Sequence, residues 1–93
     1  MPHPILKVHS TSEFEKSFHK LPVRIQDLAT KKDKWFRQNA FDPRLHTHKL
    51  KGELSGYWSY YINRQYRILF RFLNGGEVVY YDIGAHDIYN QGG

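Results

Sequence analysis

The sequence predicts an α+β fold in the order β-α-α-β-β-β, with a helical hairpin packed on one face of a four-stranded, mainly antiparallel sheet. Three observations predict it. Apolar residues recur at helical spacing in the first part of the chain, the periodicity changes after residue 43, and the remainder carries aromatic and β-branched runs separated by turn signals. A chain of 93 residues has room for one core, so we expect a single domain over residues 1–93.

The first part of the chain predicts one strand and two helices. Residues 3–9 form the expected opening strand. Ser, Thr and Glu residues at 10–15 mark a helix start, with capping boxes expected on Ser10 or Ser12, and apolar side chains then recur on one helical face. Pro22 ends this helix and suits the first turn of a second one, which the sequence ends at 39–43.

The second part predicts a meander of three strands after a polar, basic connector. The strands are expected over residues 56–62, 66–72 and 77–83. In the middle strand, Tyr and other apolar residues at the even positions alternate with Arg67, Leu69 and Arg71. Because successive side chains of a strand point to opposite faces, we expect one face to meet the helices and a cationic face to stay open to a ligand.

Composition limits the function classes. Cysteine is absent, which excludes a disulfide scaffold, a thiolate zinc site and a cysteine nucleophile. No apolar run approaches the length of about 20 residues that a membrane span requires, and the N-terminal residues lack the pattern of a secretory signal. We therefore expect a cytoplasmic protein that does not bind a membrane.

The positive charge is concentrated in the middle third of the chain. Residues 43–72 contain six Lys or Arg against one acid, whereas residues 73–93 contain three acids and no Lys or Arg. Together with the many aromatic residues, this distribution favours a polyanionic partner, with RNA or DNA the leading candidates. The alternative at this stage is a basic surface without a specific partner.

Side chains with acid–base or phosphate-binding chemistry fall where the predicted topology can bring them together. Cleavage of RNA by its own 2′-hydroxyl needs a base, an acid and a cation for the phosphoryl oxygens. Histidine suits the first two roles and arginine the third, without a metal ion or cofactor. The candidates on the connector, the open face and the C-terminal end are His46, His48, Lys49, Lys51, Arg67, His86 and Tyr89.

These residues also have ordinary explanations. A histidine on a loop is usually a solvated side chain. Arg67 could pair with Glu77 or Asp82 across the hairpin in a surface ion pair. His46 and His48 could form a metal pair, but the sequence shows no third ligand, so we expect no metal site.

Three segments of the second half resemble a known family. They are residues 50–59, the Tyr66-Arg67-Ile68 triplet and residues 82–89, and they resemble the RelE/ParE superfamily of bacterial toxins from type II toxin–antitoxin modules. Residues 54–68 are most similar to the YoeB branch of that superfamily, whereas the connector and the Gly-x-His ending are similar to the YafQ branch. The helical half is generic.

The resemblance implies a RelE-like, microbial-RNase-like fold and an endoribonuclease that cuts mRNA, in most members at the ribosomal A site beside 16S rRNA. It also implies a cognate antitoxin that wraps the domain. By position, it implies a general base at His48, a phosphate contact at Lys51, a transition-state-stabilising arginine at Arg67, a general acid at His86 and an orienting aromatic at Tyr89. Other residues expected to bind RNA are His46, Lys49, Arg64 and Arg71.

The sequence departs from the family pattern at two places. Tyr61 and Gln65 stand where the YafQ branch has a further histidine and an aspartate, and His86 is followed by Asp87, where the YoeB branch has tyrosine. The roles of base and acid could therefore be divided differently between His48 and His86.

Two alternatives to the nuclease stay open. One is a ParE-like protein that binds DNA gyrase and cuts no RNA. Since members of that class generally lack a His/Arg/His set, its presence here favours the nuclease. The other is an RNA-binding or antitoxin-binding domain without catalysis.

Overall fold

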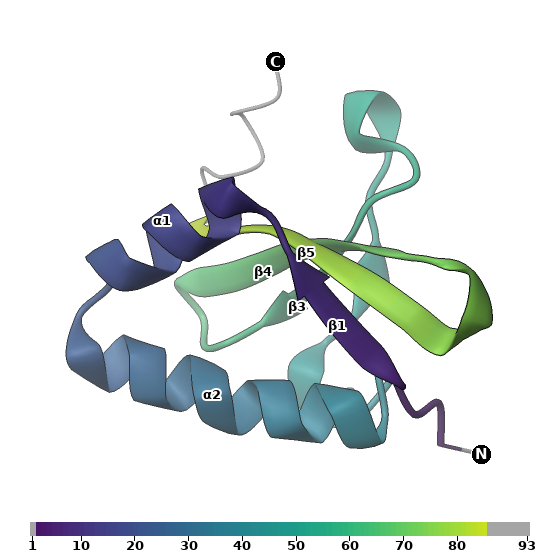
Figure 1. Ribbon diagram of the computed structural model, residues 1–93, viewed down its shortest axis with the longest axis horizontal. Coiled ribbons are helices and arrows are strands. Elements are labelled where there is room, and N and C mark those ends of the chain that lie inside the picture. Colours follow the sequence, from purple (N-terminus) through teal and green to yellow (C-terminus); the bar gives the residue numbers. More distant parts are fainter. Residues whose placement is uncertain (1, 86–93) are drawn as a thin grey trace.

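The computed structural model describes residues 2–85, and over that range two α-helices pack on one face of a five-stranded sheet (Figure 1). In chain order the elements are β1 (Lys7–Ser10), α1 (Ser12–Lys20), α2 (Val23–Gln38), β2 (His48–Lys49), β3 (Trp58–Tyr61), β4 (Tyr66–Phe72) and β5 (Glu77–Ala85). Short 3₁₀ helices occupy η1 (Pro43–Leu45), η2 (Gly52–Leu54) and η3 (Asn74–Gly76). The predicted α+β class and the helical hairpin are confirmed.

The sheet has the order β1-β5-β4-β3-β2, in which β1 runs parallel to β5 and the other neighbours are antiparallel. The prediction of four strands was wrong by one, because the connector contributes β2. This edge strand consists of two polar residues, His48 opposite Ser59 and Lys49 opposite Trp58. Two residues are too few to show the alternation of apolar and polar side chains that predicts a strand. Neither α1 nor α2 is long and apolar enough to span a bilayer.

The opening strand is shorter than residues 3–9. The N–H of Ile5 donates to the carbonyl of Arg37 in α2 at 2.8 Å, so at this point the chain is bonded to the helix. Pairing with β5 begins at Lys7. The strand boundary therefore depends on a contact between segments far apart in the sequence.

The N-cap of α1 is Thr11, whereas capping boxes on Ser10 or Ser12 were expected. Its hydroxyl oxygen accepts a hydrogen bond from the N–H of Phe14 at 3.0 Å and donates to the carbonyl of Tyr81 at 2.8 Å. The second bond joins the start of the helix to β5, which explains why Thr11 caps here. Ser10 instead donates its hydroxyl to Glu15.

The core lies between the helices and the even-numbered face of β4. Phe36 of α2 is at its centre, with ring-centroid distances of 4.6 Å to Tyr60, 4.9 Å to Phe70 and 5.9 Å to Tyr80. All four side chains are buried. The prediction that the even positions of β4 meet the helices agrees with the burial of Ile68 and Phe70.

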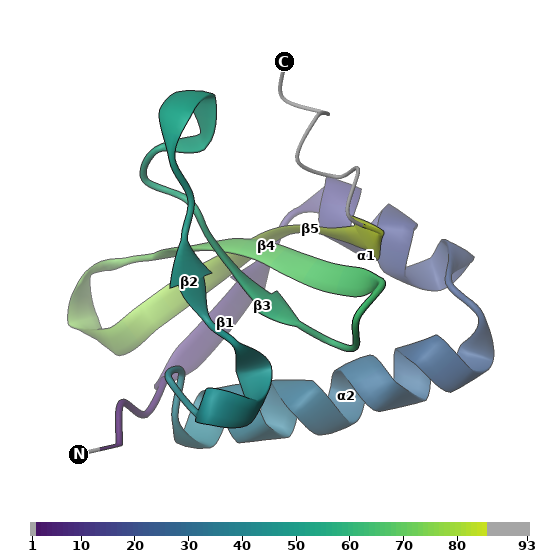
Figure 2. The same cartoon turned by 180° about the vertical axis from the view of Figure 1, so that it is seen from behind.

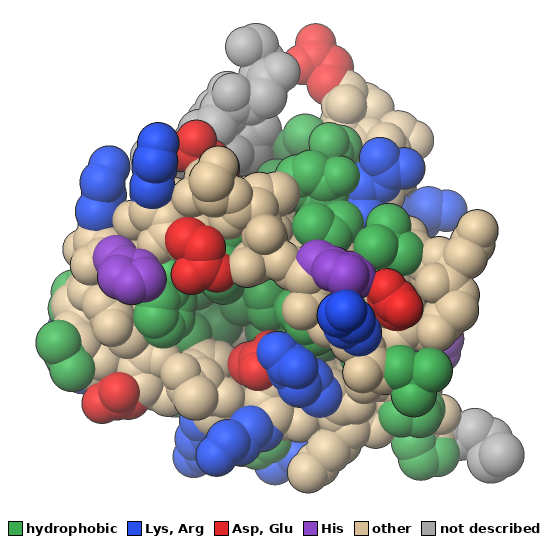
Figure 3. Space-filling model, viewed as in Figure 1, with side chains coloured by type: hydrophobic (Ala, Val, Ile, Leu, Met, Phe, Trp, Pro, Cys, Tyr) green, Lys and Arg blue, Asp and Glu red, His purple; other side chains and the backbone are tan. Residues whose placement is uncertain are grey.

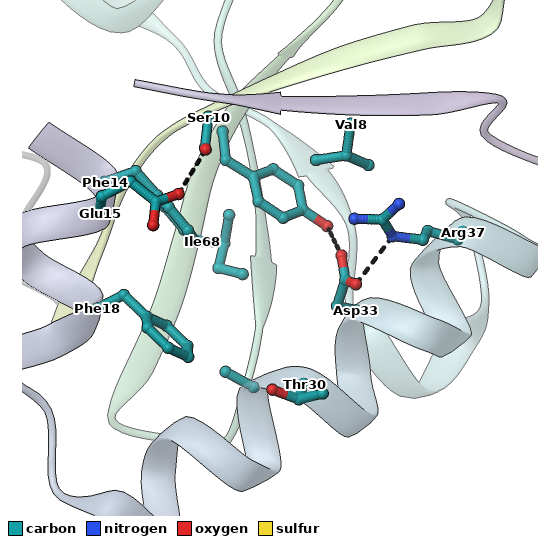
Figure 4. A pocket seen from close by; sticks show the side chains of 11 residues that line it. Val8, Ser10, Phe14, Glu15, Phe18, Thr30, Asp33, Arg37 and Ile68 are labelled. Atoms are coloured by element: carbon teal, nitrogen blue, oxygen red, sulfur yellow. Dashed lines mark hydrogen bonds and ion pairs between the residues drawn. The ribbon is translucent and has the colours of Figure 1, made fainter. Parts of the chain in front are cut away.

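A polar chain runs from this core to the surface of α2. The hydroxyls of Tyr60 and Tyr80 are 2.8 Å apart, the Tyr80 hydroxyl donates to Asp33 Oδ1 at 2.6 Å, and Arg37 Nε donates to Asp33 Oδ2 at 2.8 Å. Burial raises the pKa of both tyrosines well above their ordinary value. Figure 4 shows Asp33 at the wall of a cavity of about 180 Å³ between the helices and β1.

We expect Asp33→Ala to lower the free energy of unfolding by about 1–3 kcal/mol, because it leaves the buried Tyr80 hydroxyl without its acceptor. Urea denaturation of the purified protein measures this change. Asp27→Ala, at an exposed position of the same helix, is the control and should change stability by less than about 0.5 kcal/mol. Equal effects of the two substitutions would show that the polar chain contributes nothing.

Candidate active site

The face of the sheet opposite the helices carries two cations on β4. Arg67 lies near the start of the strand and Arg71 four residues further on, on the face predicted to be cationic. Leu69, between them, is only 8% exposed. The predicted open face therefore has two separate cationic regions with a buried apolar residue, Leu69, between them.

The first region is organised around the ring of Tyr61 at the end of β3. The ring of His46 lies 4.9 Å from it between centroids. The ring of His48 lies 6.0 Å from it and nearly perpendicular to it, and Arg67 Cζ is 4.1 Å from the Tyr61 centroid. We refer to His46, His48, Tyr61 and Arg67 as the Tyr61 cluster. It joins the connector to β3 and β4, so two imidazoles and a guanidinium surround one aromatic ring.

The turn η1 sets the position of the two histidines. Asp42 caps η1 by accepting the N–H of Arg44 at 2.9 Å, and the buried side chain of Leu45 anchors the segment in the core. His46 then adopts a left-handed conformation, with φ of 53°, which ends η1 and turns the chain. Two residues later, His48 enters β2.

One hydrogen bond determines the tautomer of neutral His48. Its Nδ1 lies 2.8 Å from the carbonyl oxygen of His46. Since a carbonyl can only accept, Nδ1 carries the proton, and in the neutral ring Nε2 is then the unprotonated nitrogen. His48 is therefore arranged to accept a proton at Nε2, as a general base must.

The guanidinium of Arg67 makes no ion pair within residues 2–85. Glu77 instead pairs with His9 at 2.7 Å, and the carboxylate of Asp82 accepts the N–H of Ile83 at 2.8 Å. Arg67 Nη1 donates one bond, at 3.3 Å, to the carbonyl of Arg64. The surface ion pair considered from the sequence is thus absent from the described residues, and guanidinium donors are left for an anion such as phosphate.

The second cationic region consists of Tyr57, Arg71 and Tyr81. Arg71 Cζ lies 5.5 Å from the centroid of the Tyr57 ring, which contacts Tyr81 at 5.2 Å. With about 3.3 Å per residue, the Cα atoms of Arg67 and Arg71 are about 13 Å apart along β4. The two regions are therefore separate concentrations of positive charge on the open face.

The remaining predicted residues lie away from the Tyr61 ring or beyond the described range. Alternation in β2 places Lys49 on the opposite face from His48. Lys51 precedes η2 on an exposed segment that projects from the sheet (Figure 2), and Arg64 is exposed in the turn before β4. His86 and Tyr89 lie outside the described residues.

Tyr61 was missed as a site residue. In the sequence, Tyr61 stands out as a departure from the family pattern and not as a member of the predicted site. The available signal was its position directly before the β3–β4 turn, because Tyr61 and Arg67 are then opposite each other in the antiparallel pair. Cross-strand neighbours of this kind bring their side chains into contact.

The charges around η1 include a tight ion pair. Arg44 donates to both oxygens of Asp42, at 2.7 Å from Nη2 and 3.0 Å from Nε. These hydrogen bonds lower the pKa of the Asp42 carboxyl to about 2. Among residues 2–85 no three His, Asp or Glu side chains gather closely enough to hold a metal ion.

Acid titration tests this ion pair. An aspartate in the unfolded chain titrates near about 3.9, so a folded-state pKa of about 2 stabilises the fold above about pH 4, and the stabilisation is lost as the pH falls toward 2. NMR titration of the Asp42 carboxyl should give that low midpoint. In Arg44→Gln the midpoint should return toward the ordinary value, and an unchanged midpoint would contradict the assignment.

Comparisons with known proteins identify the fold. No protein-family model matches the sequence, and no curated protein matches it. Among solved structures, the YoeB/ParE toxin from Agrobacterium tumefaciens is 19% identical, with a TM-score of 0.73 over 87% of this chain and 99% of that chain. YafQ from E. coli is 12% identical, with a TM-score of 0.70 over 88% and 94%.

A further match is the toxin–antitoxin complex RelBE2 from Mycobacterium tuberculosis. It is 25% identical, with a TM-score of 0.66 over 92% of this chain and 100% of that chain. All three matches span nearly the whole length of both proteins. The chain therefore has the RelE-like fold of the RelE/ParE superfamily, as the resemblance in its sequence implied.

Proposed function

We propose that this protein is the toxin of a type II toxin–antitoxin module and that it cleaves mRNA, at the ribosomal A site, as an endoribonuclease. The observation that carries the proposal is the convergence of His46, His48 and Arg67 on Tyr61, on the face that the helices leave open. The structural matches that form toxin–antitoxin complexes support an antitoxin as partner.

In the proposed reaction the 2′-hydroxyl of a nucleotide attacks the adjacent phosphorus. His48 Nε2 takes the 2′-hydroxyl proton, and the guanidinium of Arg67 binds the phosphoryl oxygens, on which negative charge increases in the transition state. The bond to the 5′-oxygen breaks, and that oxygen takes a proton from an acid. The products are a 2′,3′-cyclic phosphate and a 5′-hydroxyl.

We assign the acid role to His86. β5 runs antiparallel to β4, and Gly84 is paired with Arg67. The last described residue, Ala85, therefore lies beside the start of β4, and His86 follows it in the sequence. Lys51 and Tyr89 remain proposed contacts to the phosphate and to the base or leaving group, and His46, Lys49, Arg64 and Arg71 proposed RNA-binding residues.

Mapping of 5′ ends in a translated message tests this function. Expression of the protein should produce cuts at codon spacing within the reading frame, and expression of Arg67→Ala should not. An intact message accompanied by gyrase-linked DNA breaks would overturn the proposal in favour of the ParE-like alternative.

We expect Tyr61→Ala to reduce the cleavage rate by about 10²-fold, because the ring that both imidazoles and Arg67 contact is lost and small displacements of catalytic groups are costly. Tyr61→Phe is the matched control, since it keeps the ring and should retain most activity. The rates are measured on translating ribosomes under single-turnover conditions. An equal loss of cleavage rate in both variants would mean that the contribution of Tyr61 comes from its hydroxyl and not from the packing of its ring.

A further inference from the structure

A second group of cations surrounds the indole of Trp35, outside the site described above. Lys32 Nζ lies 4.0 Å and Lys31 Nζ 5.4 Å from the ring centroid, and Arg44 Cζ lies 3.6 Å from it. Lys31 precedes Trp35 by four positions on α2 and Lys32 by three, which places both lysines beside it on the helix. Arg44 reaches the ring from η1. We refer to Lys31, Lys32, Trp35 and Arg44 as the Trp35 cluster.

The Trp35 cluster carries unneutralised positive charge. Within residues 2–85, Asp42 is the one carboxylate that forms an ion pair with a cation of the cluster. Three cations and one carboxylate give the group a net charge of +2. Burial lowers the pKa of Lys32, and the charges of Lys31 and Arg44 lower it further. Since like charges this close repel one another, an anion bound here would remove an electrostatic cost that the free protein bears.

The Trp35 cluster is connected to the Tyr61 cluster through η1. The turn lies beside the C-terminal half of α2 (Figure 2), and its Arg44 is two residues before His46. Two residues span at most about 7 Å of chain, so one short segment supplies a guanidinium to the Trp35 ring and an imidazole to the Tyr61 ring. On the opposite side of the molecule, which carries β1, Lys and Arg side chains also lie over α2 (Figure 3).

We propose that the Trp35 cluster binds the phosphate backbone of the RNA strand a few nucleotides from the bond cleaved at the Tyr61 cluster. The inference rests on the nuclease function proposed above, because it identifies the anion as RNA. An acidic segment of a protein partner has a similar charge. RNA is favoured because the short segment that carries Arg44 and His46 connects the Trp35 cluster to the Tyr61 cluster, and a polyphosphate strand is an anion long enough to follow it.

Binding is measured with a fluorescent 2′-O-methyl RNA of about 12 nucleotides, which cannot undergo 2′-hydroxyl attack. The variant Lys32→Gln/Arg44→Gln removes two cations of the Trp35 cluster. Lys16→Gln/Lys20→Gln, at exposed positions of α1, removes the same charge elsewhere and is the matched control. Fluorescence anisotropy at several salt concentrations gives the Kd and its salt dependence, and circular dichroism verifies that each variant is folded.

The cluster variant should bind the RNA about tenfold more weakly at low salt. The slope of log K against log salt should decrease in magnitude by about 1.4, which is 0.7 for each of two lost phosphate contacts. The α1 control should keep nearly the wild-type slope. If the cluster variant has the same Kd and the same salt dependence as the α1 control while the wild-type protein still cuts mRNA, this inference alone is overturned.

Two further outcomes separate the inference from the proposed function. If the cluster variant loses affinity for the antitoxin but keeps its affinity for RNA, the Trp35 cluster is a protein-binding site and the RNA assignment is wrong. If the wild-type protein neither binds the RNA nor cuts mRNA, this inference and the proposed function are both overturned.

Discussion

Replacement of Arg67 by alanine should lower the rate of mRNA cleavage by about 10³-fold while the protein stays folded. The reason is the position of the guanidinium, which is held 4.1 Å above the Tyr61 ring and makes no ion pair within residues 2–85. Its N–H groups are available to hydrogen-bond the phosphoryl oxygens, on which negative charge develops. Removal of such donors typically lowers the reaction rate by about 10²–10³-fold or more. Single-turnover cleavage on translating ribosomes measures the effect.

Two variants identify what Arg67 contributes. Arg67→Lys keeps the charge but loses the planar fork that can bind two oxygens, and should recover only part of the rate. Arg24→Ala removes a charge at an exposed position of α2 and should leave the rate unchanged. If Arg67→Ala retained most of the wild-type activity, the Tyr61 cluster would not be the catalytic site.

Replacement of His48 by glutamine should lower the cleavage rate by about 10²–10⁴-fold, the range over which general bases typically contribute. Glutamine can still hydrogen-bond but cannot accept the proton that we assign to Nε2. In the wild-type protein, protonation of the base at acidic pH should reduce the rate. In the variant this dependence should disappear, because the group that causes it is gone.

A pH–rate profile therefore distinguishes a base from a merely structural residue. His19→Gln, at an exposed position on α1, is the matched control and should reproduce the wild-type profile. If His48→Gln lowered the rate but kept the acidic limb of the profile, another residue would be the base. His46, which contacts the same ring, would be the first to test.

The parts of the fold predicted from the sequence are those with a local periodic signal. The even positions of β4 fill the core and Arg67 and Arg71 lie on the other face, because alternation over seven residues is a strong pattern. In the structure the same alternation divides the aromatic residues at 57–61 between the two faces. Tyr60 packs on Phe36, whereas Tyr61 lies beneath Arg67.

The parts that were missed depend on contacts between distant segments. β2 has two residues, and the cap at Thr11 depends on a bond to Tyr81. Lys49 was grouped with His48, but adjacent residues of a strand point to opposite faces. Likewise, no spacing in the sequence places the rings of His46 and His48 beside Tyr61, because that requires the left-handed turn at His46.

The chemistry of the cut ends tests the central claim most directly. Messages cleaved by the wild-type protein on ribosomes should carry a 2′,3′-cyclic phosphate on the upstream fragment and a 5′-hydroxyl on the downstream one, identified by mass spectrometry. Those ends arise when the 2′-hydroxyl is the nucleophile. In this mechanism the imidazoles transfer the protons and Arg67 stabilises the negative charge on the phosphoryl oxygens. Fragments ending in a 3′-hydroxyl and a 5′-phosphate would mean that water is the nucleophile, and would contradict the mechanism.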